Sequence, residues 1–180
     1  MNEKVALLFV KQSGHVLAAI TRAADPEGKL SVADLAGEGL LVRGFDDILP
    51  LTAITERFEV SPDDLDVLIT DHTPDLLLQP RSFVIDQTQN APVIISASIQ
   101  SIVVTATKAT ISLSAPAQGN KGVWVQIAGG SLVRPQSKKG LIPSGTATLD
   151  IPLETLAPGN YFALALVSLH SPKGANVTIT

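Results

Sequence analysis

Short apolar runs separated by turn-forming residues recur along the chain, and they predict a fold built mainly from β-strands. In the first half, apolar runs at residues 5–10 and 15–22 flank a short loop that contains Gly14, a pattern typical of a β-hairpin. Further short strands are predicted at residues 29–35, 40–43, 65–70, 76–79 and 82–86.

Two stretches of the first half favour helix. Leu51, Ile54 and Phe58 have the spacing of one helix face, and Pro50 suits a first turn, so residues 50–60 are the best helix candidate. A strand over residues 55–60 fits nearly as well. Ser61 precedes a proline and two aspartates, an N-cap pattern that predicts a short helical turn. The first half is therefore predicted to be β-rich with one or two short helices.

In the second half, strands separated by turns at regular spacing are typical of a β-sandwich. The predicted strands are residues 93–98, 99–105, 110–114, 123–128, 131–134, 146–151, 162–169 and 177–180. Residues 136–140 are predicted as a turn. Residues 86–92 are polar, lack a pattern and end in proline, as expected of an inter-domain linker. We therefore predict a β-rich N-terminal domain over residues 1–88 and a sandwich over residues 89–180.

One turn connects this half to a known fold. Leu156, Pro158 and Gly159 lead into Tyr161, which is the only tyrosine and is followed by a long apolar run. This stretch resembles the tyrosine corner of immunoglobulin-like and fibronectin-III-like domains. The resemblance implies an immunoglobulin-like sandwich in which the tyrosine hydroxyl bonds to the backbone a few residues upstream. Trp124, in an earlier predicted strand, is expected to be a core aromatic.

Charge is distributed unevenly between the two halves. Residues 1–90 carry seven Lys/Arg and fifteen Asp/Glu, whereas residues 91–180 carry six and two, giving net charges of −8 and +4. Only 17% of all residues are charged, where about 25% is usual. A half with so few charges is expected to expose apolar surface for protein contact. The alternative is an aliphatic sandwich that is kept soluble by serine and threonine hydroxyls.

The absence of cysteine excludes disulfides, thiolate zinc sites and a cysteine nucleophile. The first residues lack a basic leader and a cleavage site, and no apolar run approaches the roughly 20 residues that span a bilayer. We expect a cytoplasmic protein, or part of an assembly built in the cytoplasm, with no membrane span.

Few residues could support catalysis or metal binding. His72 lies between Asp71 and Asp75, yet ligands from one short loop rarely complete a metal shell. No serine occurs in a Gly-x-Ser-x-Gly elbow. Arg134, Lys138 and Lys139 form a small basic patch in a predicted loop, too sparse to indicate a nucleic-acid partner. We predict no catalytic residue, metal or cofactor.

The sequence therefore predicts a non-enzymatic structural or adaptor subunit whose partners are other protein subunits or copies of itself. Sandwich modules of this kind decorate and connect phage-tail-like and contractile injection machines. The chain finishes on an uncharged strand, predicted to be an edge that pairs with a partner's strand: Val177, Thr178, Ile179 and Thr180. Two alternatives are a glycan- or surface-polymer-binding module, which needs an exposed aromatic such as Trp124, and a hydrolase with a site near His72.

Overall fold

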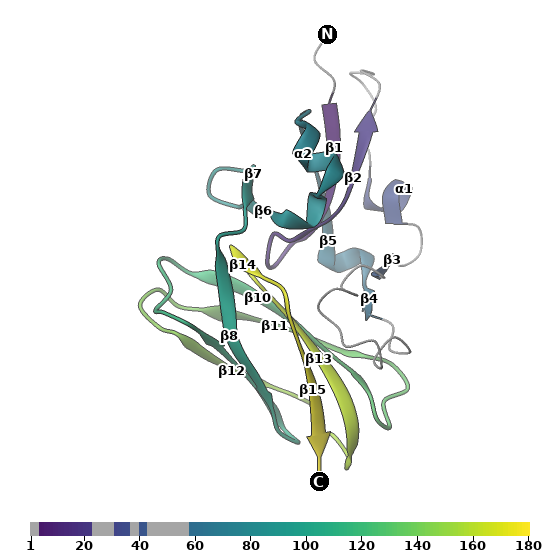
Figure 1. The fold of residues 1–180 in the computed structure, drawn as a ribbon. Coiled ribbons are helices and arrows are strands. Elements are labelled where there is room, and N and C mark those ends of the chain that lie inside the picture. Colours follow the sequence, from purple (N-terminus) through teal and green to yellow (C-terminus); the bar gives the residue numbers. More distant parts are fainter. Residues whose placement is uncertain (1–3, 23–30, 37–39, 43–57) are drawn as a thin grey trace.

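The computed structural model describes residues 4–22, 31–36, 40–42 and 58–180, and it confirms the predicted mainly β class (Figure 1). Residues 1–3, 23–30, 37–39 and 43–57 lie outside the described part, and so does most of the helix predicted at residues 50–60. None of the described helices has the length and apolar character needed to cross a bilayer.

A three-stranded antiparallel sheet forms the body of the N-terminal half. Its order is β2 (Val16–Arg22), β1 (Lys4–Val10) and β5 (Leu65–Asp71), so the predicted hairpin of β1 and β2 is confirmed. The central strand β1 is buried on both faces. Val5 and Leu7 face one apolar cluster, while Leu8 and Val10 face another.

Short helices and hairpins complete this half. They are α1 (Val32–Ala36), the β3–β4 hairpin (Leu40–Val42 and Phe58–Val60), the 3-10 turn η2 (Pro62–Asp64), α2 (Pro74–Leu78) and the 3-10 turn η3 (Pro80–Ser82). The turn predicted from Ser61 is confirmed, because the Ser61 hydroxyl accepts the Asp63 amide proton at 3.3 Å.

The strands predicted at residues 29–35 and 76–79 are wrong in the described part of the chain, where short helices include residues 32–35 and 76–78. Residues 29 and 30 lie outside that part. Before α1, the amide and hydroxyl of Ser31 both donate to the Asp34 carboxylate, at 2.8 and 2.7 Å, which favours a helical first turn. Before α2, Pro74 supplies the helical φ angle, and Leu76 is buried in the cluster that also contains Phe83. Residues at the start of each helix therefore decide these two segments, through Ser31 and Asp34 for α1 and through Pro74 for α2.

Two four-stranded sheets pack face to face in the C-terminal half, forming a β-sandwich (Figure 1). One sheet has the order β11 (Gln136–Ile142), β10 (Lys121–Gly129), β13 (Gly159–Val167) and β15 (Lys173–Ile179). The other has the order β12 (Thr148–Pro152), β9 (Lys108–Leu113), β8 (Ala97–Val104) and β14 (His170–Ser171). Alternate residues of β10 and β13, such as Val125 and Ala165, fill the space between the sheets.

The strand predicted at residues 131–134 is wrong, and so is the turn predicted at residues 136–140. The first segment is a turn, whereas the second lies in β11 and pairs with β10 over its whole length. As an edge strand, β11 tolerates two adjacent lysines, since Lys138 pairs with Glu154 and Lys139 pairs with Asp64.

The predicted boundary between residues 88 and 89 falls in the turn of a hairpin. Strands β6 (Phe83–Asp86) and β7 (Ala91–Ile94) pair across it, from Phe83 opposite Ile94 to Asp86 opposite Ala91. The N-terminal half also packs directly on the sandwich, because one apolar cluster contains residues of β1 and β5 together with residues of β10 and β13. The two halves are therefore joined through a shared core.

Candidate functional site

Within the described residues, the surface where the two halves meet contains three buried polar or charged side chains that bond to the opposite half, Asp64, Gln126 and His15. We call this surface the joint. Its apolar part lies on the outer face of β10 and β13, which the N-terminal sheet covers. Trp124 is 0% exposed there and does not contact the core between the two sandwich sheets. The cluster consists of Leu8, Val10, Val60 and Leu65 from the N-terminal half, and Trp124, Ala128, Phe162, Leu164 and Leu166 from the sandwich.

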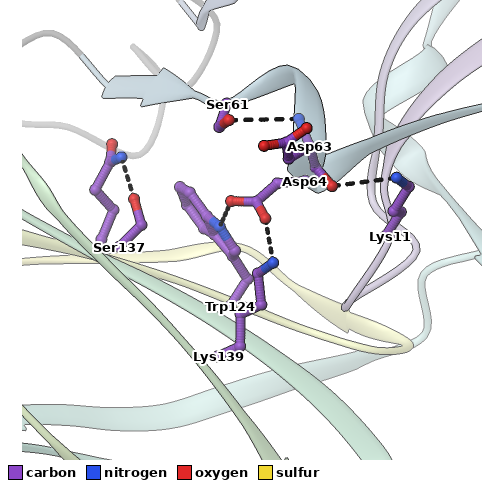
Figure 2. A network of polar contacts seen from close by, with 8 residues as sticks. Lys11, Ser61, Asp63, Asp64, Trp124, Ser137 and Lys139 are labelled. Carbon is purple, nitrogen blue, oxygen red and sulfur yellow. Dashed lines mark hydrogen bonds and ion pairs between the residues drawn. The ribbon is translucent and has the colours of Figure 1, made fainter.

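Asp64 is the charged centre of the joint (Figure 2). The turn η2 directs its carboxylate toward the sandwich, where Oδ2 accepts the indole N–H of Trp124 at 3.2 Å and Oδ1 pairs with the Lys139 ammonium. The Asp64 side chain is 9% exposed, whereas that of Lys139 is 51% exposed. The buried carboxylate is therefore compensated by one hydrogen bond and one ion pair across the joint.

Neighbouring atoms hold η2 in place. The backbone N–H of Lys11 donates to the Asp64 carbonyl at 2.8 Å, and the Lys11 ammonium donates to the Asp63 carbonyl at 3.1 Å. Both contacts come from the loop that follows β1. The turn that carries Asp64 is thus bonded to the central strand of the N-terminal sheet.

Two glutamine side chains form hydrogen bonds with backbone groups across the joint. The Gln126 side chain on β10 accepts the Glu59 N–H at 3.2 Å and donates to the Glu59 carbonyl at 2.7 Å. The Gln12 amide donates to the Gly140 carbonyl at 2.8 Å. These planar amides occupy the positions that backbone groups have in a paired strand. They satisfy polar backbone that the joint would otherwise leave without partners.

Gly122 allows the closest approach of the two halves. A Cβ atom at this position would lie 1.8 Å from the Gln12 carbonyl oxygen. The clash would involve the carbonyl carbon and oxygen of the Gln12 backbone, which cannot move aside as the end of a flexible side chain could. The packing at this point therefore requires glycine.

His15 is buried at the other side of the joint, with 1% of its surface exposed. Its Nε2 lies 2.8 Å from the His170 carbonyl of β14, and its Nδ1 lies 3.0 Å from the Ser13 hydroxyl. Because a carbonyl only accepts, Nε2 carries the proton, and Nδ1 accepts from Ser13. Burial lowers the pKa of His15 to about 4, so the ring is neutral at neutral pH.

The residues of the predicted corner lie together between β12 and β13. The Tyr161 hydroxyl donates to the Ala157 carbonyl, four residues upstream, at 2.8 Å. Leu156 is buried in the sandwich core, while Pro158 is exposed in the turn. Gly130, at φ +58°, lies against the tyrosine ring, and a Cβ there would be 2.3 Å from the ring. Gly159 begins β13, next to Gly130.

The predicted partner-binding edge lies on β15 and just after it. This strand is the outermost of its sheet and pairs with β13 over residues 173–179. Ile179 is buried and Val177 half-buried, and both contact the sandwich core, whereas Thr178 and Thr180 are exposed. The Thr178 hydroxyl donates to the Asn160 side chain at 3.0 Å. A partner at this edge would therefore contact backbone and polar side chains.

The other candidate residues do not converge. Asp71 pairs with Lys4, and His72 is half-buried in the loop before α2. Within the described ranges, no group of three or more His, Asp or Glu side chains is placed to hold a metal ion. The basic patch is also divided, because Lys138 pairs with Glu154 and Lys139 pairs with Asp64.

A surface pocket of about 480 Å³ lies beside the joint. Loops of both halves line it with amide, hydroxyl and charged side chains, among them Gln12, Asp86, Gln118, Asn120 and Lys121. No protein-family model matches the chain, and no curated protein is significantly similar to it in sequence. The geometry of the chain is therefore the basis for a functional proposal.

Sequence reasoning did not identify the joint residues as a group. Asp64 stood out only as a residue of a helical turn, and Gln12 lay in a hairpin loop. One signal was available: Gln126 interrupts an otherwise apolar strand, and a buried polar residue requires a specific partner. Its partner, Glu59, lies in the other half of the chain.

Proposed function

We propose that this protein is a non-enzymatic structural or adaptor subunit of a larger assembly, and that its C-terminal half is an immunoglobulin-like sandwich. The observation that carries the proposal is the position of β15 at the outside of its sheet, paired on one side by β13. An outer strand presents unpaired N–H and C=O groups, to which the strand of a partner can add.

The immunoglobulin-like assignment is supported by the bond from Tyr161 to Ala157 and by two packed four-stranded sheets. Fold similarity alone does not define a function. Phage-tail-like and contractile injection machines use such sandwiches as connectors, and we propose this kind of assembly for the protein.

The low charge of the second half supports the proposal less than the sequence suggested. One outer face of the sandwich, around Trp124 and Phe162, is covered by the N-terminal half of the same chain. The opposite outer face, on β8, β9 and β12, carries Thr110, Ser112, Thr148 and other polar side chains. Serine and threonine hydroxyls and the Lys108–Asp150 ion pair thus make much of this face polar, as the alternative interpretation of the composition expected, and Val103 is an exposed apolar side chain on it.

An edge-blocking variant tests the proposal. Thr178→Lys places a charge beside the open backbone of β15, and charged side chains discourage strand addition. Gln89→Lys, at an exposed position in the turn between β6 and β7, adds the same charge outside the sandwich and serves as the control. We expect size-exclusion chromatography with light scattering to show association of the wild type with itself or with the products of adjacent genes. Thr178→Lys should weaken that association at least tenfold, and Gln89→Lys should leave it unchanged.

The proposal is wrong if the wild type stays monomeric at high concentration and binds none of the proteins encoded beside it. Equal association by the wild type and Thr178→Lys would instead move the contact away from β15. The glycan-binding alternative needs exposed aromatic rings. The aromatic side chains whose burial is described are all buried, so they offer no stacking platform: Phe9, Phe83, Trp124, Tyr161 and Phe162.

A further inference from the structure

We propose that the joint is acid-sensitive: mild acid separates the N-terminal half from the sandwich reversibly while both halves keep their strands. The geometry points to His15, which is buried at the joint and bonded to a carbonyl of the opposite half, His170, at 2.8 Å. The inference concerns the joint within one chain, so it is independent of the β15 edge.

A charge on His15 would be poorly accommodated when the halves are docked. Its two ring nitrogens are already used, with Nε2 donating to the His170 carbonyl and Nδ1 accepting from the Ser13 hydroxyl. A second proton on Nδ1 would turn this acceptor into a donor and place a positive charge 1% exposed to solvent. Separation of the halves removes the His170 carbonyl and brings water to the ring.

The groups that surround His15 offset such a charge only in part: desolvation lowers the pKa of His15 more than the backbone hydrogen bonds to His170 and Ser13 raise it. From β14, His170 faces the ring, and charge repulsion from it lowers the pKa of His15 further. From β6, the neighbours are the backbones of Val84 and Ile85, through a bridge to Val84 and a bond from Ile85 N–H to the Gly14 carbonyl at 2.7 Å. Asp86, the nearest carboxylate along β6, accepts from Thr88 and lines the surface pocket with Lys121.

The direction of the pH effect follows from the two states. When the halves are docked, burial lowers the pKa of His15 to about 4, and a solvated histidine has the ordinary value of 6.5. Between these values the separated state binds a proton that the docked state does not, so docking weakens as the pH falls from 6.5 toward 4. The docking equilibrium would shift by about 80-fold between pH 6.5 and pH 4, and by roughly 300-fold at the limit well below pH 4.

Trp124 makes the test simple, since it is the only tryptophan and is fully buried in the joint. We would measure acrylamide quenching of its fluorescence from pH 7.5 to pH 3.5, with far-UV circular dichroism on the same samples. His15→Gln removes the titrating group and keeps an amide donor for the His170 carbonyl. His72→Gln, in the loop before α2, removes a histidine outside the joint and is the matched control.

For the wild type we expect Trp124 to become quenchable with a midpoint between pH 4 and pH 6.5, while the strand signal stays, and to be protected again at pH 7.5. His15→Gln should move the midpoint to lower pH, and His72→Gln should follow the wild type. Three results would overturn the proposal: quenching that stays flat to pH 4, quenching that rises together with loss of the strand signal, or equal midpoints for the wild type and a folded His15→Gln. The first two need only the wild type.

Discussion

Asp64 gives the sharpest test of the joint, because one short side chain bonds to two groups of the opposite half. Asp64→Ala leaves the buried Trp124 N–H without an acceptor and the Lys139 ammonium without a partner. A hydrogen bond to a charged group contributes about 1.5–3 kcal/mol. The ion pair adds about 0–1 kcal/mol, since the Lys139 side chain is 51% exposed. We expect Asp64→Ala to lower the free energy of unfolding by about 2–4 kcal/mol.

Two further variants separate these contributions. Asp64→Asn keeps an oxygen that can accept the indole proton but loses the charge, so we expect a loss of about 1 kcal/mol. Lys139→Ala removes the ion pair alone and should cost at most about 1 kcal/mol, because its ammonium group is half-exposed. Urea unfolding at pH 7.5, followed by Trp124 fluorescence and circular dichroism, measures all three. A loss under 0.5 kcal/mol for Asp64→Ala would refute the assignment of Asp64 as the anchor of the joint.

Two other contacts lead to predictions of the same kind. Tyr161→Phe removes the hydroxyl that bonds to the Ala157 carbonyl, and we expect urea unfolding to show a loss of about 0.5–1.5 kcal/mol; an unchanged midpoint would mean that this bond does not stabilise the corner. Gly122→Ala places a methyl group against the Gln12 carbonyl and should cost about 1–3 kcal/mol in the same assay. Gly159→Ala is its control, because a Cβ there meets only ordinary contacts, 3.5 Å or longer; equal losses for the two variants would contradict the steric argument.

Patterns of local origin were predicted correctly from the sequence. The β1–β2 hairpin and the Ser61 turn depend on neighbouring residues and were found where expected. Errors arose where one short pattern fits two structures. Leu76 to Leu78 suits a strand as well as a helix, and the first-turn position of Pro74 decides between them.

The joint could not be predicted for a different reason. In β10, apolar residues occupy both faces, so the sequence does not show which face, that of Trp124 or that of Val123 and Val125, packs in the sandwich core. The low charge of the second half indicated that its surface would be covered, but it did not identify what covers it. The residues that do so, such as Leu8 and Leu65, are more than 50 positions earlier in the chain.

Both faces of the sheet that contains β10 and β13 are covered, one by the other sandwich sheet and one by the N-terminal half. This limits where the chain can be cut into fragments. A fragment cut at residue 88 would keep every strand of the sandwich and yet present Phe162, Leu164 and Leu166 to water. Such a fragment would expose an apolar face that the N-terminal half covers in the whole chain. The same contact restricts substitution on both surfaces, because a larger side chain on one requires a smaller one on the other.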